Sequence, residues 1–137
     1  MFVASLAVLP LISLAAATTY QVQVGSSNIT NQLTFDPYAV PAVVGDVIQF
    51  VFHQKNHTVT QTSFANVCNP LLDENSHQPV FDTGFQPVAA DQTDDFPTYN
   101  YTVVDLKPVW LYCRQKGHCG QGKWSEARFC DRFLTAS

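Results

Sequence analysis

The chain has 137 residues, enough for one ordinary domain, and 46% of them are hydrophobic while only 13% are charged. This composition excludes a disordered tail, and a formal net charge of −4 without a basic stripe argues against a nucleic-acid partner. Eight prolines, six glycines and 12% aromatic residues favour short strands and turns over helices.

The first 17 residues, MFVASLAVLPLISLAAA, form an uncharged apolar run that ends in small residues, as at a signal-peptidase site. The run is shorter than the ~20 residues that a membrane span requires, and Pro10 in its middle argues against a buried helix. We therefore expect residues 1–17 to be a signal peptide and the mature chain to start at Thr18. Because no hydrophobic tail follows, we expect a soluble secreted protein without a membrane span.

Two further features agree with secretion. Three Asn-X-Thr sequons, at Asn28, Asn56 and Asn100, are glycan acceptor candidates in a secretory lumen. The oxidising destination also favours a disulfide among the four cysteines.

Short strand-like segments recur along the mature chain. They are residues 20–24, 46–52, 57–61, 99–104 and 109–113. Between them, residues 64–97 are rich in Asn, Asp, Pro and Gly, which predicts a long irregular crossover with Phe81, Phe85 and Phe96 as anchors. Without repeats or helical periodicity, residues 18–122 are expected to form an all-β sandwich or Greek-key barrel.

One pair of residues suggests a metal site. Cys113 and His118 lie five positions apart in a glycine-containing loop after a strand, a spacing that lets a thiolate and an imidazole reach one ion. His57, expected to open a neighbouring strand, is the best second imidazole. His53 is expected to be exposed at a strand end, and His77 to be solvated in a polar loop. Two imidazoles and one thiolate form the equatorial set of a blue-copper electron-transfer site.

The residues alone leave other interpretations open. Zinc takes the same ligands, and Cys113 could be an ordinary buried cysteine or pair with Cys68 or Cys130. We expect Trp110 and Tyr112 to be core packing. The Asp94-Asp95 pair is interpreted as solvated rather than catalytic.

Several segments carry a family resemblance. They are NHTVTQ at 56–61, Cys68 with Pro70-Leu71, DTGFQPV at 82–88, VWLYC at 109–113 and His118-Cys119. In this order, over roughly residues 20–122, they resemble the fungal extracellular cupredoxin-like proteins, which are similar to the plant phytocyanins. The resemblance implies a Greek-key β-sandwich, one type 1 copper and a secreted or wall-associated location.

The resemblance also implies roles for particular residues. It makes His57, Cys113 and His118 the copper ligands and pairs Cys68 with Cys119 in a disulfide, which leaves Cys113 as a thiolate. Closing that loop would contribute roughly 4 kcal/mol in the chain-entropy model and brace the segment that carries His118.

The C-terminal part departs from the family pattern. The axial Met or Gln expected five residues after His118 is Lys123, whose ammonium has no lone pair, and Gln121 is two residues early, so the axial ligand is absent or unknown. Residues 123–137 contain no β-branched residue before Thr135, which makes the final strand doubtful. This divergent tail is either a genuine C-terminus, with Cys130 as an odd thiol, or translated intron, since Gly-Lys-Trp can be encoded through the splice-donor sequence GTAAGT.

The leading functional hypothesis is a secreted, monomeric cupredoxin-like protein that binds one copper for electron transfer or copper handling, with an unknown redox partner. It is not expected to be an enzyme, because no Ser-His-Asp order, paired carboxylates or phosphate-binding loop is found. The alternative is a metal-free structural or interaction module that keeps the sandwich but has lost the copper site.

Overall fold

The computed structural model describes residues 16–25, 34–121 and 124–127, and its elements there are strands and two short 3₁₀ turns. The strands are β1 (Thr19–Val24), β2 (Phe35–Asp36), β3 (Val47–Phe52), β4 (Lys55–His57), β5 (Thr60–Thr62), β6 (Gln86–Val88), β7 (Thr98–Thr102), β8 (Val109–Tyr112) and β9 (Trp124–Ala127). The turns are η1 (Phe64–Asn66) and η2 (Cys119–Gln121).

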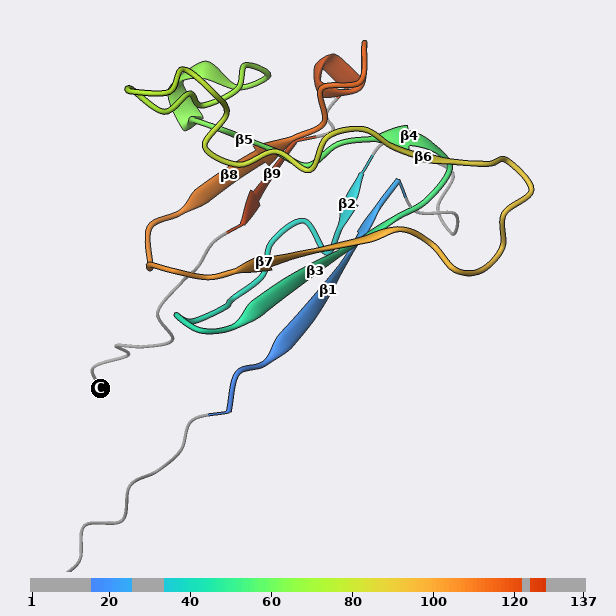
Figure 1. The fold of residues 1–137 in the computed structure, drawn as a ribbon, viewed down its shortest axis with the longest axis horizontal. Helices are drawn as coiled ribbons and strands as arrows, with labels where there is room; N and C mark the ends of the chain where they lie inside the picture. The colour runs from blue at the N-terminus through green and yellow to red at the C-terminus, as the bar shows by residue number, and fades with distance from the viewer. Residues whose placement is uncertain (1–15, 26–33, 122–123, 128–137) are drawn as a thin grey trace, which may run out of the picture.

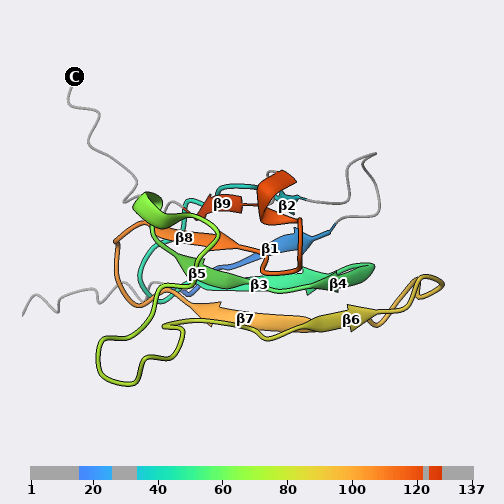
Figure 2. The ribbon, with the colours of Figure 1, turned by 90° about the horizontal axis from the view of Figure 1, so that it is seen from above.

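The strands form two main layers. A four-stranded sheet has the order β2-β1-β3-β7, and a three-stranded sheet, β5-β8-β9, lies above it in Figure 1. β4 and β6 form a separate pair toward one end, which Figure 2 shows from above. β1 and β3 are parallel and the other neighbours antiparallel. The predicted all-β Greek-key sandwich is confirmed.

Period-two patterning explains the core. In β3 the side chains of Ile48, Phe50 and Phe52 are buried while those between them are half-exposed, because successive residues of a strand point to opposite faces. From the facing sheet, Val109 and Leu111 are buried in the same cluster, which also includes Cys113. Each fully buried large apolar side chain contributes about 1.5–3 kcal/mol, so the metal site described below is attached to a packed core.

A buried carboxylate fixes the entrance to this sheet. Asp46 is almost fully buried and accepts hydrogen bonds from the backbone N–H groups of Thr18 (2.8 Å) and Val43 (2.9 Å). Buried charge is tolerated only with such partners. The first residue of the expected mature chain is therefore tied to the start of β3.

The segment predicted as one strand over residues 57–61 is interrupted. β4 ends at His57 and β5 begins at Thr60, so His57 closes a strand instead of opening one. The cause is that the intervening N–H groups donate to side chains: Thr58 N–H to Cys113 Sγ (3.4 Å) and Val59 N–H to Thr83 Oγ1 (2.9 Å).

The long crossover is mostly irregular, as predicted, but contains η1 and β6. Phe81 and Phe96 pack against the core as anchors, whereas Phe85 is 46% exposed. Strand β2 was not predicted; its two residues follow the polar turn and pair with the end of β1.

A final strand is present in the part that the sequence left doubtful. β9 pairs antiparallel with β8 in the register Val109↔Ala127 to Tyr112↔Trp124. Backbone pairing does not require β-branched side chains, and the edge of β8 supplies the ladder. Residues 1–15, 122–123 and 128–137 lie outside the described part, as do most of the expected signal peptide and the rest of the expected tail.

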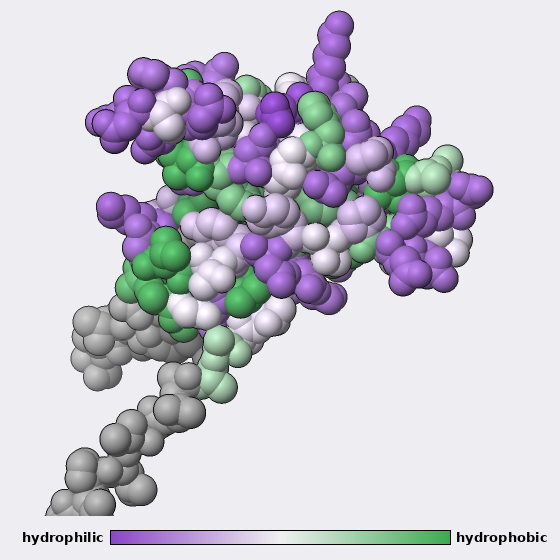
Figure 3. All heavy atoms as spheres, in the orientation of Figure 1, coloured by the Kyte–Doolittle hydropathy of each residue, from purple (hydrophilic) through white to green (hydrophobic). Residues whose placement is uncertain are grey.

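The surface in Figure 3 is largely polar, with exposed apolar side chains in separate patches between polar ones. Within the described ranges, no helix has the length and apolar character needed to cross a membrane.

Candidate metal centre

Three predicted ligands, from distant parts of the chain, meet at one point of the sandwich. Their donor atoms, one from each of His57, Cys113 and His118, all lie within 4.8 Å of one another. Cys113 Sγ is 3.9 Å from His57 Nδ1 and 3.5 Å from His118 Nδ1, and the two imidazole centroids are 5.1 Å apart.

The neighbouring strands bring these residues together. β5 and β8 pair in the register Thr60↔Tyr112, so the residue before β5 and the residue after β8 come close. Thr58 N–H donates to Cys113 Sγ across this junction. His57 and Cys113 are therefore held by backbone pairing and not by flexible loops.

The orientation of the His57 ring is set on its other side. Its Nε2 donates to the carbonyl oxygen of Gln54 (3.0 Å), which assigns the ring hydrogen to Nε2 and leaves Nδ1, toward the sulfur, as the lone-pair atom. A metal-bound imidazole usually donates its other N–H in this way. Only 1% of the His57 side chain is exposed, so the ring has little room to turn.

Gly25 packs directly against this ring. A Cβ built on Gly25 would overlap His57 Nε2 and lie 2.7 Å from Cδ2 and 2.8 Å from Cε1. Gly25 also has φ +80°, a conformation that residues with a Cβ rarely adopt. Both facts require glycine at this place.

His118 is the most accessible of the three. Its ring is half-exposed, whereas Cys113 is fully buried. Its backbone N–H donates to the Gln115 carbonyl (3.0 Å) in a tight turn that passes through Gly117 at φ +83°. This turn folds the five-residue spacing back so that the imidazole faces the sulfur.

The donor set fits a single first-row metal ion. With metal–sulfur and metal–nitrogen bonds of about 2.3 and 2.0 Å, sulfur and nitrogen are about 3.5 Å apart in a tetrahedral array and about 3.7 Å apart in a trigonal one. The observed separations of 3.5 and 3.9 Å span these values. One soft thiolate with two imidazoles suits copper or zinc.

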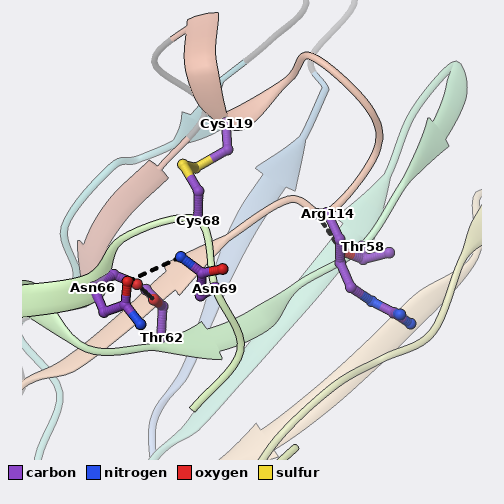
Figure 4. The surroundings of a disulfide bond; sticks show 7 residues. All are labelled: Thr58, Thr62, Asn66, Cys68, Asn69, Arg114 and Cys119. Carbon is purple, nitrogen blue, oxygen red and sulfur yellow. Dashed lines mark hydrogen bonds between the residues drawn. A yellow bond between two sulfur atoms is a disulfide. The ribbon is translucent and has the colours of Figure 1, made fainter.

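A disulfide braces the loop that carries His118. Cys68 and Cys119 are bonded, with Cα atoms 5.7 Å apart and a sequence separation of 51. Figure 4 shows the bond joining the segment after η1 to the start of η2, with Asn66 and Asn69 hydrogen-bonded beside it. Cys113 is left as a free, buried thiol, as the metal interpretation requires.

The side chain next to Cys113 stays uncharged. Burial raises the pKa of the Tyr112 hydroxyl; Arg114 opposes the rise, and the charges of Asp82 and Cys113 add to it. Tyr112 is buried and Trp110 packs on Phe64 with ring centroids 5.0 Å apart, which agrees with their expected packing role.

The other histidines lie apart from the cluster. His53 was expected to be exposed, and this was wrong. Its ring is buried against Phe96 at 4.3 Å between centroids, and its Nε2 is 2.6 Å from Gln23 Oε1. These partners are far away in sequence, so the local pattern could not show them. His77 is exposed as expected.

The remaining predicted residues are more scattered. Asp94 and Asp95 are exposed, as expected of a solvated pair. Of the sequon residues, Asn100 is exposed on β7, while Asn56 is half-buried in β4. Asn28, Lys123 and Cys130, together with the side chain of Gln121, lie outside the described part.

Sequence reasoning missed the residues that support the ligands. Gly25 was read as the start of a turn, and no local signal links it to His57. Thr58 was noted only as a strand residue and Arg114 only as part of the loop. The NHTVTQ segment was a usable signal, since three of its residues line the junction with Cys113.

Comparisons with known proteins agree with this geometry. No family model matches the chain. The chain is 30% identical over 112 residues to "Probable GPI-anchored cupredoxin-1" of Arthroderma benhamiae, a match that covers 82% of this chain and 52% of the relative. The chain therefore spans about half the length of that curated relative.

Solved structures share the fold at low sequence identity. A purple cupredoxin from Nitrosopumilus maritimus has a TM-score of 0.53 at 9% identity, covering 79% of this chain and 96% of the other. Reduced auracyanin from Roseiflexus castenholzii has a TM-score of 0.54 at 14% identity, covering 83% and 98%. Fold, motif order and relatives together place the chain among the cupredoxin-like proteins, with a fungal cupredoxin as its curated relative.

Proposed function

We propose that this protein binds one copper ion through His57 Nδ1, Cys113 Sγ and His118 Nδ1 and serves as a carrier of single electrons, not as an enzyme. The observation that supports this most directly is the convergence of the three donor atoms within 4.8 Å on a packed β scaffold. When bound, copper supplies a one-electron couple between its two common oxidation states.

The protein's own residues are arranged for such a role. The buried sulfur accepts the Thr58 N–H, which favours its negative charge and keeps water away. Gln54 and Gly25 hold the His57 ring from two sides, so little reorganisation of ligands is expected between oxidation states. Half-exposed His118 is the ligand that the surface of a redox partner could approach.

We further propose that the protein acts outside the cell or at its surface. The apolar N-terminus, the disulfide and the GPI-anchored fungal relative support this location. The redox partner is not identified by any of these features.

Copper titration tests the metal proposal. Every sample carries Cys130→Ser, so that Cys113 is the one cysteine outside the disulfide. We expect one equivalent of Cu(II) to produce an intense thiolate charge-transfer band with narrow hyperfine splitting. Cys113→Ser should abolish the band, and His77→Gln, which removes an exposed imidazole, should leave it unchanged.

Two outcomes would refute the proposal. Stoichiometric zinc binding without a visible copper band would assign the cluster to a zinc site. A colourless protein with no stoichiometric binding of either metal would favour the metal-free module.

A further inference from the structure

A ring of hydrogen bonds encloses the peptide that follows Cys113. The backbone N–H of Arg114 donates to Thr58 Oγ1 at 2.9 Å, the contact drawn in Figure 4. The guanidinium of the same residue forms an ion pair with Asp82, with Nη2 and Oδ2 2.6 Å apart. Thr60 completes the ring, because its hydroxyl lies 2.9 Å from both Thr58 Oγ1 and Asp82 Oδ1.

The hydrogens of this ring can point in only one direction. A carboxylate has none to give, so the Thr60 hydroxyl donates to Asp82 and must accept from Thr58. The Thr58 hydroxyl in turn accepts from the Arg114 N–H. Both threonines are fully buried, and such chains strengthen one another where water is excluded. We call Arg114, Thr58, Thr60 and Asp82 the carboxylate relay.

The relay holds the sulfur from two sides. Its first member, Arg114, is the residue after Cys113, and its second member, Thr58, donates its backbone N–H to Cys113 Sγ. A shift of either residue would change the direction and length of this N–H···S contact. Hydrogen bonds to a ligand sulfur are among the features that set the potential of a copper–thiolate site.

Asp82 is where the relay ends, and its position does not depend on the relay. Its backbone bridges to Thr60, its Oδ1 also accepts the Gly84 N–H at 3.2 Å, and Arg114 lies over the Phe85 ring, 5.1 Å from the centroid. Removing the carboxylate charge should therefore disturb the relay while leaving the loop backbone in place.

We propose that Asp82 and Arg114 are positioning residues for Cys113: through the carboxylate relay they fix the sulfur and its N–H···S contact from a distance. This inference rests on the proposed copper function for its consequence. Its structural part concerns the metal-free protein and is measurable there.

The test compares Asp82→Asn and Thr60→Val with Asp94→Asn, which makes the same charge change at an exposed site of the crossover. Thr60→Ser is the rescue, because it keeps the hydroxyl. In the metal-free Cys130→Ser protein, we expect Asp82→Asn and Thr60→Val to move the amide resonances of Thr58 and Arg114 and to speed thiol modification of Cys113. Asp94→Asn and Thr60→Ser should resemble the parent protein in both measurements.

In the copper-loaded protein, the same two variants should shift the reduction potential and the thiolate band and lower metal affinity by about 10- to 100-fold. A purely structural role would lower the unfolding midpoint without moving the band. Asp82→Asn indistinguishable from Asp94→Asn in amide resonances, thiol reactivity and band position would overturn the positioning role while leaving copper binding intact. If the parent binds no copper but the metal-free differences appear, the positioning role stands and the proposed function fails.

Discussion

Substitution of Gly25 by alanine is expected to damage the site through one identifiable clash. The new methyl carbon would overlap Nε2 of His57 and come within 2.7 and 2.8 Å of two ring carbons. Since apolar atoms pack about 3.5–4.0 Å apart, the ring must move by about 1 Å. His57 is 1% exposed, with its Nε2 bonded to Gln54 and its Nδ1 facing Cys113, so no direction is open without loss of a contact.

The size of the effect follows from two terms. The positive φ costs alanine about 1–2 kcal/mol wherever it occurs. Overpacking adds about 1–3 kcal/mol, and loss of the hydrogen bond to Gln54 about 0.5–1.5 kcal/mol. Gly45→Ala is the matched control, because Gly45 has φ +96° and nothing within 4 Å of its Cβ position. We expect Gly25→Ala to be about 1–4 kcal/mol less stable than Gly45→Ala.

The assay is urea unfolding of both metal-free variants, followed by copper titration of the same preparations. Gly25→Ala should also weaken copper binding, whereas Gly45→Ala should not. Equal unfolding free energies for the two variants, together with unchanged copper affinity, would refute the argument that Gly25 positions His57.

Two further predictions concern stability. Replacing Cys68 and Cys119 by serine together should lower the free energy of unfolding by about 4 kcal/mol, because the loop they close spans 51 positions; denaturant unfolding under oxidising conditions measures it, and a loss below about 1 kcal/mol would contradict the chain-entropy account. Burial lowers the pKa of His53 below its ordinary 6.5, so the unfolded chain binds the extra proton first and stability present above about pH 6.5 is lost as the pH falls toward the folded pKa. His53→Gln should reduce this loss between pH 7.5 and 5, while the exposed-site control His77→Gln should keep it; identical pH dependence in His53→Gln and the parent would exclude His53 as a source.

The strands that could be read from the sequence are those in which pattern and burial coincide. β3 shows this best, because its alternating residues face a core on one side. Residues 57–61 misled the prediction because their side chains look like a strand. Their backbone N–H groups instead bond to Cys113 and Thr83, which local pattern cannot reveal.

The sequence by itself determined the class of the fold and the identity of the ligand types. Alternation and turn residues limited the chain to a β-sandwich, and the Cys-X₄-His spacing with a distant His indicated one metal site. These are local properties, since side-chain chemistry and short spacing are written directly in the chain.

Tertiary structure decided which histidine joins the site and what holds it there. His53 and His57 are four residues apart and both buried, yet one packs on Phe96 and the other faces Cys113. The choice depends on partners 43 or more residues away, and the same is true of Gly25 against His57 and of Asp82 behind Cys113. Contacts between such distant residues exist only once the sheets are paired, because pairing and not sequence proximity sets which side chains share a space.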